Sequence, residues 1–357
     1  MKILLSACLI FLCSIVYCQR SKTEIIDPEK LTFKELKLTA QRSAPATIRL
    51  PFSSIKIVDS RFDTTKLGFL PTSSLIYDKK SVFSKIRFKG GGVAKPLEEY
   101  YNDYYQKSFT ANGFELLIVM KRFWLSGIDY TRDKRIVLTN SLETATNLYF
   151  KWEYYLGKEG KYMPLKRVDT LMQVSDEQAA SIDEDFHERR LNRFKFTLKA
   201  MIELYDFSSK VELFDKQPAK TMDEILNFNA KRNEIVILKD STFKKGVYLS
   251  FEEFKNNTPS IKDYKEEKTR YKVFKKERYL TDANGNLITE YWGYSDGEEF
   301  RYGKFGNDKL FRIGNTFQFF VQMNNAEINT DPNAATGKDL VKVWFPYQID
   351  METGNVY

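Results

Sequence analysis

Residues 114–124, Phe-Glu-Leu-Leu-Ile-Val-Met-Lys-Arg-Phe-Trp, decide the fold because their apolar core, Leu116–Met120, has the length of a buried strand. A strand that is apolar at successive positions is covered on both of its faces. The segment before it, residues 95–112, has a different period. Its apolar residues recur every three or four positions, at Leu97, Tyr100, Tyr101, Tyr104, Tyr105 and Phe109. This spacing predicts an amphipathic helix that ends at Asn112-Gly113.

A second strand is expected on the other side of that helix. In residues 54–59 Ile55 and Ile57 alternate with polar neighbours, which is typical of a half-buried strand. Residues 59–66, Asp-Ser-Arg-Phe-Asp-Thr-Thr-Lys, leave the strand as a polar turn before Gly68. Strand, helix and strand in this order predict a helix packed on a sheet.

Two further strands and a long helix are expected next. Residues 148–156 and 162–174 flank Gly157-Lys158-Glu159-Gly160, a hairpin signal. Ser175-x-x-Gln178 then has the pattern of a capping box, and apolar residues at helical spacing follow it to about Tyr205. These residues predict a long helix that connects two domains. A second capping box, Thr221-x-x-Glu224, predicts a shorter helix over residues 222–230.

The second half of the chain is richer in strands and turns. Ser250-x-x-Glu253 predicts a short helix over residues 251–255. Closely spaced turn pairs come after it, at Asn284-Gly285, Asp296-Gly297, Gly306-Asn307 and Gly314-Asn315. The apolar or aromatic segments between these turns predict an antiparallel meander or a small barrel.

The expected fold class is therefore α+β, with a helix-on-sheet N-terminal domain, a long connecting helix and a β-rich C-terminal domain. The boundaries that follow from the patterns are a signal peptide over residues 1–18, a tether over 19–46, an α/β domain over 47–174, a helical connector over 175–233 and an antiparallel β-rich domain over 234–357.

Two segments of the C-terminal half carry a resemblance to known proteins. Residues 246–257, Gly-Val-Tyr-Leu-Ser-Phe-Glu-Glu-Phe-Lys-Asn-Asn, and residues 291–300, Tyr-Trp-Gly-Tyr-Ser-Asp-Gly-Glu-Glu-Phe, resemble a module that recurs in uncharacterised exported proteins of Gram-negative bacteria. The N-terminal pattern from Ile55 through the apolar strand is similar to small envelope lipoproteins that accompany transport or cell-wall machinery. Neither resemblance implies an activity or a functional residue.

The N-terminal residues have the pattern of a cleavable export signal. Lys2 precedes an apolar run, residues 3–17, that is shorter than the roughly 20 residues needed to span a membrane. Val16 and Cys18 suit the −3 and −1 positions of a signal-peptidase site, which leaves Gln19 as the first mature residue. Alternatively, residues 15–18 resemble a lipobox with Cys18 as the lipidated residue, although Tyr17 is bulkier than the usual residue there. We expect a periplasmic, outer-envelope or secreted protein without a transmembrane segment after the leader.

Composition excludes several kinds of chemistry from the predicted mature chain. All three cysteines, Cys8, Cys13 and Cys18, lie in the leader, so cleavage after Cys18 leaves no disulfide and no thiolate. His187 is the single histidine, which excludes sites built from several histidines. Asp282-x-Asn284-x-Asn286 lacks the glycine and terminal acid of a calcium loop. We therefore predict no metal site, no cofactor and no catalytic residues.

The charged and aromatic residues indicate which kinds of partner the protein binds. The net charge is +8, but basic and acidic residues alternate even in the most basic stretch, residues 265–278, which argues against nucleic acid. We therefore expect a non-catalytic interaction or assembly protein with an envelope protein or a glycan as its partner. The alternative is a carbohydrate- or small-ligand-binding module, or a carbohydrate-active enzyme, that uses Trp292, Tyr294 and Asp296. Packing of these aromatic rings inside the meander explains them more simply.

Overall fold

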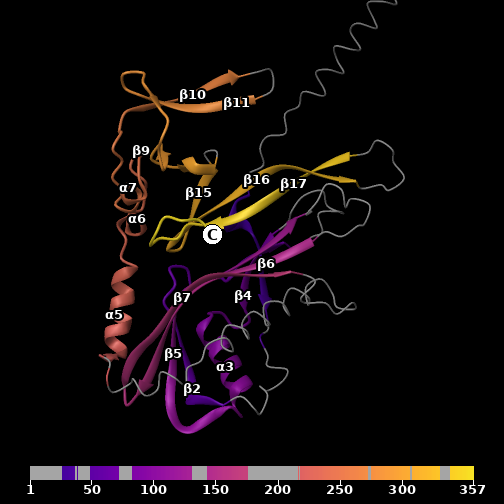
Figure 1. Cartoon of the computed structure of the whole chain (residues 1–357). Helices are drawn as coiled ribbons and strands as arrows, with labels where there is room; N and C mark the ends of the chain where they lie inside the picture. The colour runs from indigo at the N-terminus through magenta and orange to yellow at the C-terminus, as the bar shows by residue number, and fades with distance from the viewer. Residues whose placement is uncertain are drawn as a thin grey trace, which may run out of the picture.

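The computed structural model describes residues 26–36, 38, 49–71, 83–130, 143–175, 216, 218–271, 275–305, 308–329 and 338–357. A mixed eight-stranded sheet, an antiparallel six-stranded sheet and a small three-stranded sheet follow one another through the molecule (Figure 1). The two larger sheets share a core, because Phe320 packs its ring 5.3 Å from Phe69 and 5.5 Å from Phe83.

Strand β5 (Phe109–Tyr130) lies at the centre of the large sheet. One edge pairs with β2 (Leu50–Asp59) and then with β3 (Gly68–Pro71), both parallel to it, and the other edge pairs with the antiparallel strand β6 (Glu143–Lys158). Leu116–Met120 are fully buried, which confirms the strand predicted from their apolar run. The sheet is completed by β1 (Phe33–Leu36), β4 (Phe83–Phe88), β7 (Lys161–Ser175) and β8 (Lys220–Thr221).

Helix α3 (Ala94–Tyr105) covers β2, and its predicted apolar stripe, Leu97 to Tyr105, is buried. Its side chains also bond to the free edge of β2. The backbone N–H of Ile57 donates to Glu98 over 2.8 Å and that of Ile55 donates to Asn102 over 2.9 Å. The helix ends seven residues before the predicted limit, because the chain re-enters the sheet at Phe109, which pairs with Leu50. Strand pairing therefore outweighs the helical spacing of Phe109.

The predicted hairpin is confirmed. Strands β6 and β7 pair antiparallel and are joined by Glu159 and Gly160, both with positive φ, of 52° and 76°. Two such residues form the tight turn whose twist matches that of the flanking strands.

The six-stranded sheet has the order β17-β16-β15-β14-β13-β9. Five of its strands, β13 to β17, are consecutive along the chain and form an antiparallel meander. The turn signals predicted this meander. The strands are β9 (Gly246–Tyr248), β13 (Gly293–Ser295), β14 (Phe300–Tyr302), β15 (Asp308–Ile313), β16 (Thr316–Asn329) and β17 (Lys338–Gln348). The small sheet consists of β10 (Tyr264–Tyr271), β11 (Lys275–Asp282) and β12 (Leu287–Ile288).

Three helices lie along one side of the molecule: α5 (Met222–Arg232), α6 (Val236–Lys239) and α7 (Phe251–Lys255) (Figure 1). The N-caps predicted for α5 and α7 are present. Thr221 and Glu224 form a complete capping box on α5, and Ser250 accepts from the backbone N–H of Glu253 on α7. Short 3₁₀ turns occupy Pro28–Lys30 and Gly303–Phe305.

The predicted α+β fold class is wrong. The described chain is mostly β, with seventeen strands against four α-helices, the longest of which has 12 residues. The N-terminal half is a large mixed sheet with one covering helix, and a long connecting helix is not found among the described elements. Ser175, its predicted N-cap, ends strand β7 instead, and the rest of that segment lies outside the described residues. Phe109 and Ser175 both follow a helical pattern in the sequence, but in the structure each pairs with a neighbouring strand. The helix predicted at these two residues was therefore wrong.

Several predictions fall outside the described residues. They include the leader with Cys18, residues 19–25, 37 and 39–46 of the predicted tether, and His187. The described part of that tether is not a free arm, because its strand β1 pairs with β4 in the large sheet. Within the described part of the chain, no helix is long and apolar enough to cross a membrane.

Candidate functional site

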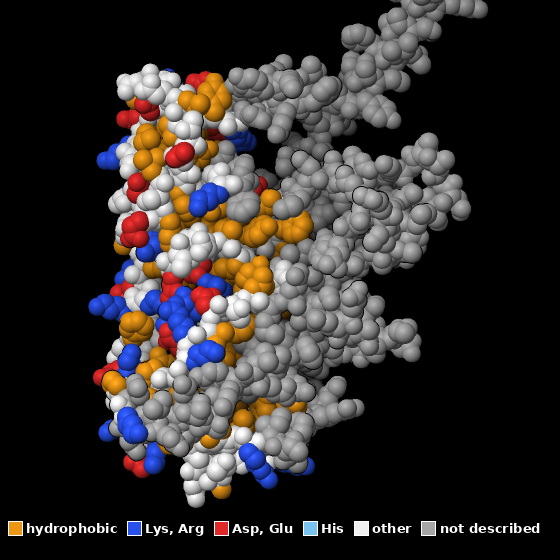
Figure 2. Space-filling view, in the orientation of Figure 1, with side chains coloured by type: hydrophobic (Ala, Val, Ile, Leu, Met, Phe, Trp, Pro, Cys, Tyr) orange, Lys and Arg blue, Asp and Glu red, His pale blue; other side chains and the backbone are white. Residues whose placement is uncertain are grey.

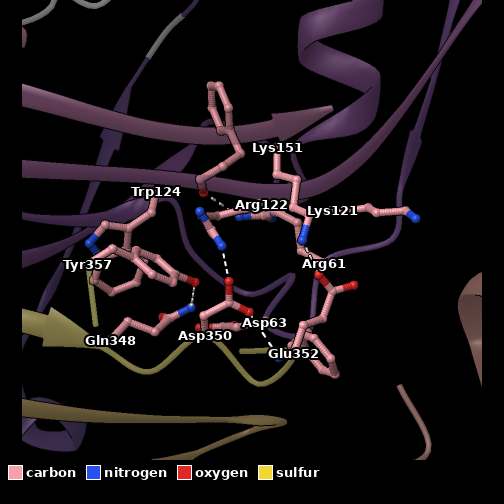
Figure 3. A pocket seen from close by; sticks show the side chains of 12 residues that line it. Arg61, Asp63, Lys121, Arg122, Trp124, Lys151, Gln348, Asp350, Glu352 and Tyr357 are labelled. Carbon is pink, nitrogen blue, oxygen red and sulfur yellow. Dashed lines mark hydrogen bonds and ion pairs between the residues drawn. The ribbon is translucent and has the colours of Figure 1, made fainter. Parts of the chain in front are cut away.

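Charged side chains gather where the large sheet meets the last turn of the chain (Figure 3). We call this cluster the ionic junction. Its cations are Arg61, Lys66, Lys121, Arg122, Lys151 and Arg232, and its anions are Asp59, Asp63, Glu153, Asp169, Asp350 and Glu352. They come from the loop after β2, from β5, β6, β7 and α5, and from residues 348–357.

The loop over residues 59–66 supplies the first group of charges. Arg61 binds Asp59 through two N–H groups, each 2.8 Å from a carboxylate oxygen, and donates to the backbone oxygens of Lys66 and Phe123. Lys66 is 1% exposed and pairs with Asp63, which also accepts from the N–H and hydroxyl of Thr65. The sequence predicted a polar turn here, and the structure buries its charged residues Arg61, Asp63 and Lys66.

A β-bulge in β5 supplies two neighbouring cations. The pairing register with β6 shifts between Met120 and Arg122, so Lys121 is an extra residue without a partner on β6. A bulge redirects side chains where it interrupts a ladder. Lys121 reaches Glu153 at 2.5 Å, whereas Arg122 pairs with Asp350 and lies 3.0 Å from Asp169.

Residues 348–357 close the ionic junction from the other side. The backbones of Gln348 and Tyr357 exchange two hydrogen bonds, of 2.9 and 3.0 Å, across the turn. Glu352 pairs with Lys151 and lies 3.4 Å from Arg232. The Tyr357 ring lies 4.6 Å from the Arg122 guanidinium carbon. The turn is therefore held to the large sheet by ion pairs and by the Tyr357 ring, which also contacts Trp124 and Tyr149.

Burial and pairing shift the pKa values in this cluster. Burial lowers the pKa of Lys66 and of Lys121, and their partners Asp63 and Glu153 act in the opposite direction. Burial alone would raise the pKa of Glu352, but the hydrogen bond from Lys151 and the charge of Arg232 outweigh it, so that this pKa is lowered. Glu352 is therefore a carboxylate near neutral pH.

The ionic junction leaves little room for chemistry. Its hollow measures about 20 Å³, which is the space of a single water molecule. Each carboxylate that lines it, on Asp63, Asp350 and Glu352, already pairs with a cation. In the described ranges, no group of three or more acidic, histidine or cysteine side chains is placed to hold a metal ion. This arrangement suits a structural joint better than a substrate pocket.

The three residues predicted as a ligand site are not brought together. Trp292 is 4% exposed and packs on Phe254 with ring centroids 4.3 Å apart. Tyr294 is 3% exposed and belongs to a different apolar cluster, beside Val247. Asp296 is exposed and accepts hydrogen bonds from the backbone N–H groups of residues 298 and 299 in its turn.

An open groove of about 540 Å³ nevertheless runs beside Trp292. It lies between the start of α7, the segment before β13, the end of β14 and the C-terminal turn. The partly buried rings of Phe251 and Tyr291 line it, and Trp292 lies against Phe251. Six exposed polar side chains also line it, those of Ser250, Thr289, Glu290, Lys304, Thr353 and Asn355.

The surface charge is mixed in sign. On the face in Figure 2, basic and acidic side chains lie side by side. The same holds on the β10–β11 hairpin, where Arg278 pairs with Glu266 at 2.8 Å. The mixed composition of residues 265–278 thus corresponds to ion pairs on a hairpin.

Sequence reasoning missed the ionic junction and the two outer rings of the groove. A signal for the junction existed, because Lys121-Arg122 interrupts an otherwise apolar buried strand. Buried cations require anionic partners. No comparable signal distinguished Phe251 and Tyr291 from the other aromatic residues.

Comparison with protein-family models, with curated proteins and with solved structures finds no match for this chain.

Proposed function

We propose that this chain is an exported, non-catalytic interaction protein of the cell envelope or the secreted fraction. Export rests on the leader pattern of residues 1–18. The observation that carries the non-catalytic role is the pairing within the ionic junction. Its carboxylates converge as in an acid–base site, but cations neutralise them and the hollow admits one water.

Exposed apolar side chains in the C-terminal half support a partner-binding role. Leu249 and Leu287 are 44% and 58% exposed, and Leu249 also lines the groove. Large apolar side chains on a surface are typical of interaction sites when they gather near a concave region. We propose that a protein partner of the envelope binds the surface around Leu287, which lies outside the groove lining.

Site-specific cross-linking tests this proposal. The full chain is expressed in a Gram-negative host with a photoreactive residue at Leu287, and at Glu159 of the β6–β7 turn as the control position. We expect one reproducible envelope protein at Leu287 and not at Glu159. Hydrolysis of glycoside, ester or phosphate substrates by the purified chain, lost in a carboxylate variant, would contradict the non-catalytic role.

The mature N-terminus is tested by intact-mass spectrometry of the exported protein. We expect the mass of a chain that starts at Gln19, and a mass that includes a lipid on Cys18 would support the alternative. An unprocessed Met1 in exported material would contradict export by a cleaved leader.

The ligand-binding alternative is favoured by the groove beside Trp292, whose volume lies in the range of roughly 300–1,000 Å³ typical of small-ligand sites.

A further inference from the structure

Two aromatic rings in the groove are seated directly on glycine backbone. A Cβ atom at Gly354 would lie 2.4 Å from Cγ of Phe251, and one at Gly303 would lie 2.8 Å from Cδ2 of Tyr291. Any other residue at either position would therefore displace the ring. The rings are held in place on one side while part of each remains accessible.

Other rings support them: Trp292 lies against Phe251, and Tyr294 lies 6.0 Å from Tyr291 between centroids. Trp292 lies 5.5 Å from Phe251 between centroids and is itself packed between Phe254 and Tyr302. This buried layer makes the groove floor rigid. Rigid aromatic surfaces bind at a low cost in conformational entropy, because few rotamers are lost on binding.

The polar side chains of the groove differ from those of the ionic junction. Glu290 and Lys304 are exposed and, among the described residues, make no hydrogen bond or ion pair. They border the same hollow as the two rings, so a ligand that covers the rings also comes within reach of one acceptor and one donor.

Strand β13 does not offer a backbone edge to a peptide. Strand β13, next to the groove, is paired on both sides, with β14 and with β9. Addition of a peptide strand to the sheet is therefore blocked at β13. The rings of Phe251 and Tyr291 are partly accessible, and the Lys255 ammonium lies 5.6 Å from the Phe251 centroid. Such rings with separate hydrogen-bonding groups suit a sugar ring, which has a face of C–H groups and an edge of hydroxyl groups.

We propose that this groove is a carbohydrate-binding site, in which Tyr291 and Phe251 stack against sugar rings and Glu290 and Lys304 bond to their hydroxyl groups. The inference rests on the proposed non-catalytic binding role and assigns that role a second, glycan ligand. Trp292 supports Phe251, and Tyr294 supports Tyr291. Because the groove is open, we expect it to take internal residues of an oligosaccharide chain as well as its ends.

Binding is tested on an array of oligosaccharides of glucose, mannose and N-acetylglucosamine that includes soluble cell-wall fragments. We expect the mature chain to bind at least one class, and titration calorimetry then measures the affinity for that glycan. Tyr291→Ala is expected to weaken it by about 10-fold or more, whereas Tyr291→Phe keeps the ring and stays within about 2-fold.

Surface variants keep the test independent of folding. The double variant Glu290→Ala/Lys304→Ala removes two exposed side chains without described partners, and we expect about 10-fold weaker binding with an unchanged melting temperature. Glu298→Ala, an exposed carboxylate outside the groove lining, is the matched control and should bind like the wild type.

The proposal is overturned if the wild type binds no glycan on the array. Equal binding by the wild type, Tyr291→Ala and the double variant would also overturn it, and so would a peptide found to occupy the groove.

Failure of the carbohydrate site is distinguishable from failure of the proposed function. An envelope partner cross-linked at Leu287 without glycan binding would remove only the carbohydrate site, whereas measured hydrolysis would remove the non-catalytic role.

Discussion

Lys151 of β6 and Glu352 of the C-terminal turn form an ion pair although 201 residues separate them in the sequence. The Lys151 side chain is only 4% exposed, and Arg232 of α5 approaches the same carboxylate. Glu352 therefore joins three parts of the chain, namely the large sheet, helix α5 and the turn that follows β17.

Removal of the Glu352 charge tests the importance of this joint. Glu352→Gln is expected to lower the free energy of unfolding by about 2–4 kcal/mol, because it leaves buried cations without their main anion. Urea denaturation measures the change. The control is Glu234→Gln, whose pair with Lys239 is more than half exposed on both sides. An exposed pair contributes about 0–1 kcal/mol. Equal effects of the two substitutions would show that the junction does not stabilise the fold.

The same carboxylate predicts a dependence on pH. The pKa of Glu352 is lower in the folded chain than its usual value of 4.5, despite the opposing effect of burial, because Lys151 and Arg232 favour the charged form. Its stabilisation is therefore fully present above about pH 4.5 and is lost as the pH falls through the folded-state pKa. We expect the stability difference between the wild type and Glu352→Gln to shrink steadily below pH 4.5 in urea titrations. A difference independent of pH from 3 to 7 would contradict this prediction.

Turns and helix caps could be predicted from the sequence because the residues that form them are close together in the chain. The Glu159-Gly160 turn and the Thr221 capping box depend on residues within four positions of one another. The strand over residues 114–124 was evident because burial on both faces requires an apolar run.

The ionic junction and the groove could not be predicted because their parts meet only in the tertiary structure. Asp350 lies 228 residues after Arg122, and nothing in either segment identifies the other. Trp292 was predicted to contact a ligand, but α7 covers it with Phe254 from a distant part of the chain. This packing determines which aromatic rings of the meander remain accessible to solvent.

Asp308 predicts a pH dependence of stability opposite to that of Glu352. Burial raises the pKa of this carboxyl to about 6, and its Oδ2 atom has no hydrogen-bond partner. As the pH rises, the Asp308 carboxyl loses its proton in the unfolded chain at a lower pH than in the folded chain. Its contribution to stability therefore falls between about pH 4 and pH 6. Asp308→Asn is therefore expected to stabilise the chain by about 1 kcal/mol at pH 7 and by little below pH 4. Thermal unfolding at the two pH values measures this gain.

A second aspartate provides the control for Asp308. Burial would raise the pKa of Asp296, but the backbone N–H groups of Glu299 and Glu298 bond to its carboxylate and lower the pKa overall. Asp296→Asn should therefore give no stabilisation at pH 7. A gain in the Asp296 variant equal to that in the Asp308 variant would show that removal of any negative charge, rather than relief of a buried one, is the cause.

Gly68 marks the closest approach of β3 to the central strand. Its φ is +147°, and a Cβ atom there would lie 1.8 Å from the backbone oxygen of Leu125. Gly68→Ala must therefore break the pairing of β3 with β5 or shift one of the two strands, and we expect a loss of about 3 kcal/mol or more in unfolding free energy. Gly91→Ala separates the clash from backbone strain, because Gly91 also has a positive φ, of +77°, but has open space around it. Its expected cost is about 1 kcal/mol. If both variants unfold at the same urea concentration, strain alone explains the effect, and the contact between Gly68 and Leu125 does not constrain the sheet.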